Sequence, residues 1–282
     1  MKKEIYFYWG NQPMSFMRYM TIKSFSHFNP EWNINLIINS NEKMASHMWN
    51  STEKQDDKFY TGTDYRLKLF NINHLNILSV DSIFKLKIEN ISNIHLKDIL
   101  NWYLLSTRSC VVADMDILFC DSIEKTKGID WDANVNICNY DFFNNYMPIS
   151  MIVSKVTDKG KNPFFEEVFQ NSIKNYNPQI YESCGSYSIG YPSIYAVKDK
   201  FIDLKINKMD EDVVFPFVKA DIHHCVKFMF ERNNYHLLSE NVAGIHWYGG
   251  NPMAQSFNNA VNDTNYKDFN NTITTILKKI LG

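Results

Sequence analysis

The sequence predicts an α/β fold in which helices flank a mixed, mainly parallel sheet, and three observations support this. The chain opens with a strand, a helix and a second strand at residues 5–9, 15–28 and 34–38, an order that implies parallel pairing through a right-handed crossover. A later helix runs directly into an apolar strand at 110–113. A last amphipathic helix is expected at 268–281.

The opening elements each follow from a local pattern. Ile5-Tyr-Phe-Tyr-Trp9 is a β-rich run that ends at Gly10-Asn-Gln-Pro13. Asn29-Pro30 stops the helix that follows, and Ile34-Asn-Leu-Ile-Ile38 is the second strand. The helix carries apolar side chains at helical spacing, namely Phe16, Tyr19, Met20 and Phe25.

The later elements are predicted in the same way. The helix before residue 110 places apolar side chains on one face, at Leu96, Ile99, Leu100, Tyr103 and Leu104. We expect strand pieces at 149–153 and 188–190, separated by a helix at 163–174. We place one α/β domain at 1–254 and a C-terminal helix, packed on it, at 255–282.

Charge and cysteine content exclude several classes of function. The formal net charge is −2 and has no long block of one sign, so we expect no broad attraction to nucleic acid or to anionic membranes. The five cysteines include no CxxC pair, which favours reduced thiols in a cytosol-like compartment. The first apolar run covers only 5–9, and no later stretch approaches membrane-spanning length. We therefore expect a soluble, cytoplasmic protein with no membrane span.

Two aspartates interrupt an otherwise apolar run, Ser109-Cys-Val-Val-Ala-Asp-Met-Asp-Ile-Leu-Phe-Cys120. Asp114 and Asp116 follow the end of a parallel strand, where ligands gather in open α/β sheets. In an extended backbone their side chains would point to the same side about 6.6 Å apart, and their repulsion would either raise the pKa of one carboxyl group or require a bound cation. Carboxylate oxygens suit Mg²⁺ or Mn²⁺, with water and phosphate completing the shell. The alternative is a turn cap beside a solvated carboxylate.

Four stretches resemble the glycosyltransferases of the DXD-motif sugar-binding family, relatives of the yeast initiation mannosyltransferase, capsular-polysaccharide transferases and clostridial glucosylating toxins. They are IYFYWGNQP, SFSHFNPEWNINLI, HLKDILNWYLLSTRSCVVADMDILF and GIHWYGG. Two stretches depart from the family pattern. The usual Ser-Asp-x-x-Arg helix here begins Lys97-Asp98 and lacks that Arg, and the usual Gly-Gly-Ile-Tyr before the motif is Ser109-Cys-Val-Val112.

The resemblance implies a GT-A-like, Rossmann-like fold that binds a nucleotide-sugar donor and Mn²⁺ or Mg²⁺. Asp114 would face the ribose, the metal or both, and Asp116 would be the firmer metal ligand. His246, in a glycine-flanked segment, is our candidate for a third ligand, although a histidine beside a tryptophan is often a core residue. The implied enzyme is a hexosyltransferase that moves a sugar from a UDP-sugar to a hydroxyl of a glycan acceptor, with retention, in polysaccharide biosynthesis.

Five further residues are candidates for donor binding, each with a structural alternative. Trp247 could donate its indole N–H to the departing phosphate, with core packing as the alternative. Tyr8 and Trp9, which end the first strand, could hold the base by stacking and backbone hydrogen bonds, or could be core residues. Arg66 could pair with the diphosphate and Asp64 with a sugar hydroxyl, and the alternative is a surface ion pair.

Three polar clusters remain without an assigned role. Asn139-Tyr-Asp141 could read sugar hydroxyls or form an Asx turn. Asp210-Glu-Asp212 could supply a general base, but a solvated helix start is the favoured interpretation. The tandem pair His223-His224 is not expected to bind one metal, because adjacent side chains point in different directions.

Two other functions stay open. A sugar nucleotidyltransferase also places carboxylates and Mg²⁺ after a parallel strand, but it usually needs a glycine-rich, basic loop for the triphosphate. Residues 10–13 contain one glycine and no Lys or Arg, which argues against this class. A carbohydrate-binding protein that kept the fold and lost turnover is the second alternative.

Overall fold

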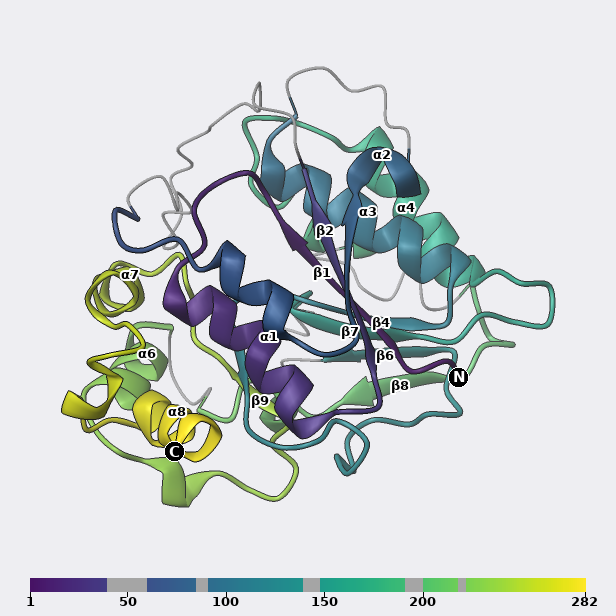
Figure 1. Cartoon of the computed structure of the whole chain (residues 1–282). Coiled ribbons are helices and arrows are strands. Elements are labelled where there is room, and N and C mark those ends of the chain that lie inside the picture. The colour runs from purple at the N-terminus through teal and green to yellow at the C-terminus, as the bar shows by residue number, and fades with distance from the viewer. Residues whose placement is uncertain (40–59, 85–90, 139–147, 191–199, 218–221) are drawn as a thin grey trace.

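The fold was obtained as a computed structural model, and it describes residues 1–39, 60–84, 91–138, 148–190, 200–217 and 222–282. Figure 1 shows the whole chain, with the sheet crossing its centre and helices on both sides. The cluster predicted at 139–141 lies outside the described residues.

The central feature of the described chain is a sheet of seven strands, and a second sheet has two. In spatial order the larger sheet contains β3 (Leu75–Ser79), β2 (Asn33–Ile38), β1 (Glu4–Trp9), β4 (Cys110–Ala113), β7 (Met151–Ser154), β6 (Val135–Cys138) and β8 (Ile206–Met209). Neighbouring strands are parallel, except that β7 runs antiparallel to both β4 and β6. The predicted mixed, mainly parallel sheet is confirmed.

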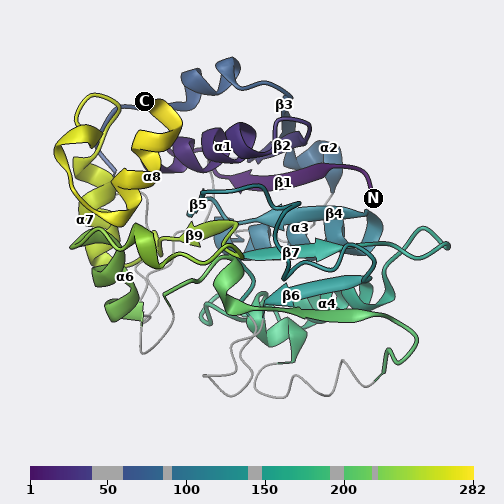
Figure 2. The same cartoon turned by 90° about the horizontal axis from the view of Figure 1, so that it is seen from below.

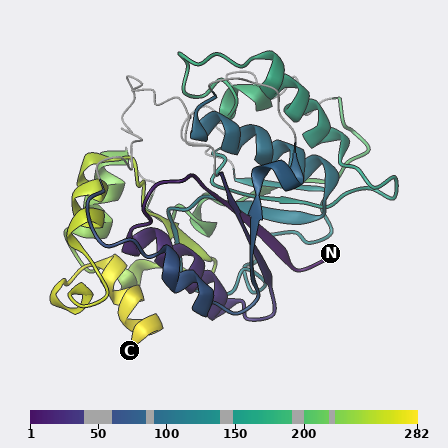
Figure 3. The same ribbon diagram turned by 45° about the horizontal axis from the view of Figure 1, so that its top comes forward.

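Helices cover both faces of this sheet. The α-helices of the described chain are α1 (Phe16–Phe28), α2 (Val80–Ile83), α3 (Asn93–Thr107), α4 (Pro163–Lys174), α6 (Ile222–Phe230), α7 (Pro252–Ala260) and α8 (Thr272–Leu281). Short 3-10 helices are η2 (Arg66–Asn71), η4 (Ser186–Ile189), η5 (Glu211–Val213), η6 (Tyr235–Leu237) and η7 (Tyr266–Asp268). Figure 3 shows the yellow C-terminal helices and the blue-to-teal pair α3 and α4 on opposite sides of the molecule.

Strand β1 contributes to the core on both faces of the sheet because its side chains alternate with a period of two. Ile5, Phe7 and Trp9 belong to the apolar core that includes α1 and the C-terminal helices. Tyr6 and Tyr8 belong to the core that includes α3 and α4. A strand buried on both faces reads as a continuous apolar run, which is the pattern of residues 5–9.

Most predicted elements are confirmed, with differences at their ends. The strand predicted at 188–190 is wrong, because Ser186–Ile189 form a 3-10 helix that ends at Gly190 with a left-handed φ of 99°. The last helix begins at Thr272 instead of 268, because a capping box at Asn271 defines its first turn. Helix α8 contacts α6 and α1. The division of the chain at residue 254 remains a prediction.

The smaller sheet pairs β5 (Ile117–Phe119) with β9 (Gly244–His246) in antiparallel register. Figure 2 shows these two strands between the larger sheet and the C-terminal helices. Because β5 follows β4 after three residues, this pairing brings the C-terminal part of the chain to the carboxyl end of β4. No helix in the described ranges combines the length and the apolar character needed to cross a membrane.

Candidate active site

Asp114 and Asp116 lie in a tight connection between β4 and β5. Strand β4 ends at Ala113, and Met115 and Asp116 form a turn before β5 begins at Ile117. The extended backbone assumed for the aspartate pair is therefore wrong, because the chain turns there to change sheets. Hydrogen bonds hold the turn on both sides: the Asp114 N–H donates to Ser150 O at 2.7 Å and the Thr21 hydroxyl donates to Met115 O at 2.8 Å.

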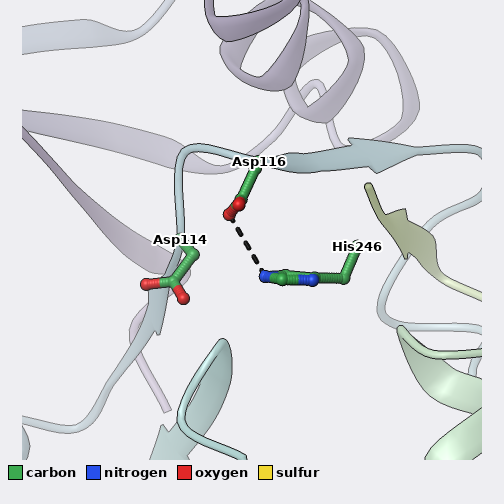
Figure 4. A group of neighbouring side chains, drawn as sticks. All are labelled: Asp114, Asp116 and His246. Atoms are coloured by element: carbon green, nitrogen blue, oxygen red, sulfur yellow. Dashed lines mark ion pairs between the residues drawn. The ribbon is translucent and has the colours of Figure 1, made fainter. Parts of the chain in front are cut away.

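His246 reaches the aspartates through the pairing of β5 with β9. It lies opposite Ile117 in the register of the smaller sheet, and the backbone N–H of Trp247 donates to the backbone carbonyl of Asp116 at 2.8 Å. As a result, His246 Nε2 lies 3.2 Å from Asp116 Oδ1. Figure 4 shows the side chains of Asp116 and His246 pointing toward each other, with Asp114 beside them.

The three side chains offer a donor set suited to a divalent ion. Ligand atoms of Asp114, Asp116 and His246 all lie within 4.8 Å of one another. Two carboxylate oxygens and one imidazole nitrogen fit Mn²⁺ well and Mg²⁺ less well, because Mg²⁺ prefers oxygen ligands. Asp114 and Asp116 remain partly open, with side chains 16% and 13% exposed, so phosphate or water could complete the shell.

The two carboxylates have opposite electrostatic surroundings. For Asp116, burial acts to raise the pKa, but the neighbouring imidazole, a guanidinium and the Gly249 amide outweigh it and hold the pKa well below its usual range. The Gly249 N–H donates to Asp116 Oδ2 at 2.9 Å. For Asp114, burial dominates and raises the pKa, despite the ammonium of Lys97 beside it. The fold therefore favours the ionised form of Asp116 and opposes that of Asp114.

Two cationic side chains that the sequence analysis did not assign border the aspartates. Lys97 Nζ, from α3, lies 2.8 Å from Asp114 Oδ1 and 3.3 Å from Asp98 Oδ1. Burial acts to lower the pKa of Lys97, but the carboxylates around it outweigh burial and raise it, so the amine stays charged. Arg18 Nη1, from α1, lies 3.6 Å from Asp116 Oδ2.

Asp98 is a third buried carboxyl group beside the site. It is 3% exposed and faces the backbone of Gly185, where an added Cβ would lie 2.8 Å from Asp98 Oδ2. Burial raises the pKa of Asp98 to about 6, although Lys97 acts in the opposite direction. The signal in the sequence for Lys97 and Asp98 was an adjacent pair of opposite charges in a helix with no other Lys, Arg, Asp or Glu. Arg18 carried no such local signal.

Residues 247–249 form a constrained segment after β9. Trp247 is completely buried, and its indole nitrogen has no hydrogen-bond partner in the part of the chain that the structure describes. Tyr248 has a left-handed φ of 52°, a conformation that costs about 1 kcal/mol for a residue with a side chain. Such strain is often found at functional sites. Tyr248 is followed by Gly249, whose backbone N–H donates to Asp116.

Tyr8 and Trp9 are buried at the end of β1. The Tyr8 hydroxyl donates to Asn93 Oδ1 at 2.5 Å, which ties β1 to the start of α3. The Trp9 indole N–H donates to Gln12 O at 2.9 Å, which supports the connection to α1. Both side chains therefore support the end of β1, and their contact with a nucleotide base remains a prediction.

Asp64 and Arg66 pair with each other. Arg66 Nη2 lies 2.7 Å from Asp64 Oδ2, and Asp64 Oδ1 accepts from the Met14 N–H at 2.9 Å. Arg66 Nη1 also donates to Asn11 O at 3.2 Å. The pair thus supports residues 11–14 after β1, and its predicted role toward the donor stays a prediction.

Among the described residues, the possible metal-binding group contains Asp114, Asp116 and His246 and no residue of the other polar clusters. Asp210 is exposed and precedes η5, as expected of a solvated helix start. His223 and His224 are exposed in the first turn of α6. The sequence analysis assigned none of these residues to the site.

Comparisons with known proteins were made on the sequence and on the structure. No protein-family model matches the sequence, and no curated protein matches it. The similar solved structures include PaToxG glycosyltransferase, with 13% identity and a TM-score of 0.45 over 72% of this chain and 75% of that one. They also include an active-site mutant of LgtC, with 12% identity and a TM-score of 0.41 over 86% of each chain.

A third similar structure is glycosyltransferase GlyE from Streptococcus pneumoniae TIGR4, with 9% identity and a TM-score of 0.46. That likeness covers all of this chain and 61% of GlyE, so this chain spans less than two thirds of the GlyE structure. Membership of the DXD-motif sugar-binding family remains a prediction from the sequence.

Proposed function

We propose that this protein is a metal-dependent glycosyltransferase that moves a sugar from a nucleotide-diphosphate sugar to a hydroxyl group of a glycan. The observation that carries the proposal is the convergence of Asp114, Asp116 and His246 at the carboxyl end of β4, with ligand atoms within 4.8 Å of one another. This edge of an α/β sheet is where ligands bind. A UDP-sugar donor and a role in polysaccharide biosynthesis follow from the sequence resemblance.

The same three side chains would hold Mn²⁺ or Mg²⁺ and leave positions for diphosphate oxygens. When bound, the ion would supply Lewis-acid stabilisation of the negative charge that develops on the leaving diphosphate. Lys97 and Arg18 add fixed positive charge from two sides. The buried indole N–H of Trp247 is a hydrogen-bond donor that a phosphate oxygen could satisfy.

The transfer needs one bond to break and one to form. The bond from the anomeric carbon to the diphosphate oxygen breaks, the acceptor oxygen bonds to that carbon, and the acceptor proton passes to the leaving phosphate oxygen. The sequence resemblance favours retention of configuration. Retention needs no dedicated base if the leaving group takes this proton, so we assign no protein side chain as general base.

A donor screen tests the proposal directly. UDP-, GDP- and other sugar nucleotides are added with Mn²⁺ or with EDTA, and the melting temperature of the protein is measured. A ligand that binds only the folded state raises the melting temperature, so we expect one class of donor to do so in the presence of Mn²⁺. Stabilisation that is the same in EDTA would contradict metal-dependent binding.

Donor hydrolysis then separates an enzyme from a binding protein. We expect slow release of the nucleotide diphosphate by the wild type, and loss of that release in Asp116→Asn. Asp132→Asn is the matched control, because Asp132 is 87% exposed and precedes β6, at the opposite end of the sheet from Asp114. Donor binding without hydrolysis or transfer to any acceptor offered would favour the non-catalytic alternative.

A further inference from the structure

Each of the two aspartates proposed to bind metal already has a cationic partner. Lys97 Nζ is 2.8 Å from Asp114 Oδ1, and Arg18 Nη1 is 3.6 Å from Asp116 Oδ2. The contact between Lys97 and Asp114 is a charge-assisted hydrogen bond, and the contact between Arg18 and Asp116 is an ion pair. The two cations come from α3 and α1, which contribute to the cores on opposite faces of the sheet. The aspartates are therefore enclosed by positive charge from both faces.

Both cations are held in place by the surrounding fold. The Arg18 guanidinium lies 4.8 Å from the ring of Trp247 and 5.6 Å from the ring of Trp9, which are cation–π distances. Gly249 leaves room for it, since a Cβ there would lie 2.5 Å from Arg18 Nη2. Lys97 has Asp98 as a second carboxylate partner at 3.3 Å.

The fixed charges of this cluster nearly cancel before any ligand binds, because three carboxylates face two cations. The carboxylates of Asp98, Asp114 and Asp116 face Lys97 and Arg18, and His246 adjoins them. A divalent ion alone would add positive charge beside two fixed cations. A diphosphate alone would add negative charge beside three carboxylates. Their charges are of similar size and opposite sign, so both together leave the balance nearly unchanged. In a partly dehydrated site such differences in charge matter strongly.

We propose that Lys97 and Arg18 are built-in counter-ions that make the divalent ion and the donor diphosphate bind as a unit. The metal binds weakly to the free protein and tightly when the diphosphate is present. This inference rests on the proposed function and adds a coupling between the binding of the metal and the binding of the donor. By thermodynamic linkage, the metal must strengthen diphosphate binding by the same factor.

The test is calorimetric titration of Mn²⁺ into the full chain, alone and with saturating UDP. We expect UDP to lower the dissociation constant of Mn²⁺ by about tenfold or more, within the usual range for coupled sites. Removing a counter-ion should have a distinctive effect. Arg18→Met and Lys97→Met should bind Mn²⁺ alone more tightly than the wild type does, and UDP should change that affinity less. Arg18→Lys keeps the charge and should keep most of the coupling.

Arg108→Met is the matched control for these variants. Arg108 also lies over an aromatic ring, 5.6 Å from Tyr6, but it precedes β4, whereas Asp114 follows this strand. The control should leave Mn²⁺ affinity and coupling unchanged, while a merely structural role of Arg18 would lower the melting temperature without tightening Mn²⁺ binding.

The possible outcomes separate this inference from the proposed function. Equal Mn²⁺ affinity with and without UDP in the wild type overturns the inference and leaves the proposed function intact. Absence of both Mn²⁺ and nucleotide binding overturns the proposed function itself. Coupling that persists undiminished in Arg18→Met and Lys97→Met also overturns the assignment of these residues. The wild-type measurement needs no variant, so the test remains decisive if a variant does not fold.

Discussion

The two aspartates of the site should affect stability in opposite directions when each is replaced by asparagine. Burial raises the pKa of Asp114, so its ionised form opposes folding at pH 7. The pKa of Asp116 is held low by its positive neighbours, so its ionised form favours folding. In the absence of metal, Asp114→Asn should therefore stabilise the protein, while Asp116→Asn should destabilise it. Both changes should abolish the tight Mn²⁺ binding that is expected in the presence of UDP.

The magnitudes follow from the contacts of each carboxylate. Asp116 Oδ1 lies 3.2 Å from His246 Nε2, and Asp116 Oδ2 lies 3.6 Å from Arg18 Nη1. Asp116 Oδ2 also accepts a hydrogen bond from the Gly249 N–H at 2.9 Å. Removing its charge leaves these donors with a weaker acceptor, which typically costs about 1–3 kcal/mol. Asp114→Asn should raise the free energy of unfolding, because it removes a carboxylate whose charged form is disfavoured by burial more than it is favoured by Lys97.

The assay is thermal and urea unfolding at pH 7 in EDTA. For a chain of this size, about 1 kcal/mol corresponds to roughly 2–4 °C in melting temperature, so the two variants should differ by several degrees. The exposed control Asp132→Asn should stay within about 0.5 kcal/mol of the wild type. If both site variants shift in the same direction, or if Asp116→Asn is the more stable one, the electrostatic assignment is wrong.

Two other predictions concern the surroundings of the site. Gly244→Ala would place a Cβ 2.7 Å from Ile117 Cγ2 and 3.1 Å from Leu118 O. The substitution should therefore destabilise the fold by about 1–3 kcal/mol, measured by urea unfolding. It should also weaken Mn²⁺ affinity, measured by calorimetry, because it moves His246. Asp98 has its pKa raised from 3.8 to about 6, so its protonated form contributes stability that is complete below about pH 4 and is lost as the pH rises through about 6. This loss is about 3 kcal/mol, and Asp98→Asn should remove it. An unchanged slope of unfolding free energy between pH 4 and 7 in that variant would contradict this interpretation.

The regular elements could be predicted because their signals are local. The apolar run at 5–9 and the helical spacing at 163–174 involve residues a few positions apart, and both elements are confirmed. The three-residue signal at 188–190 was too short to distinguish a strand from a turn of 3-10 helix. There the left-handed glycine at 190 decided the outcome.

The sequence alone determined that Asp114 and Asp116 follow a buried strand, because both facts are properties of one short segment. It also indicated His246, through its glycine-flanked segment and, more strongly, through a family resemblance. Tertiary structure decided how these residues meet. The pairing of β5 with β9 places His246 at Asp116, and the helices on the two faces of the sheet deliver Arg18 and Lys97. Long-range strand pairing and the packing of separate faces depend on the whole chain, and for this reason the counter-ions of the aspartates could not be inferred from local patterns.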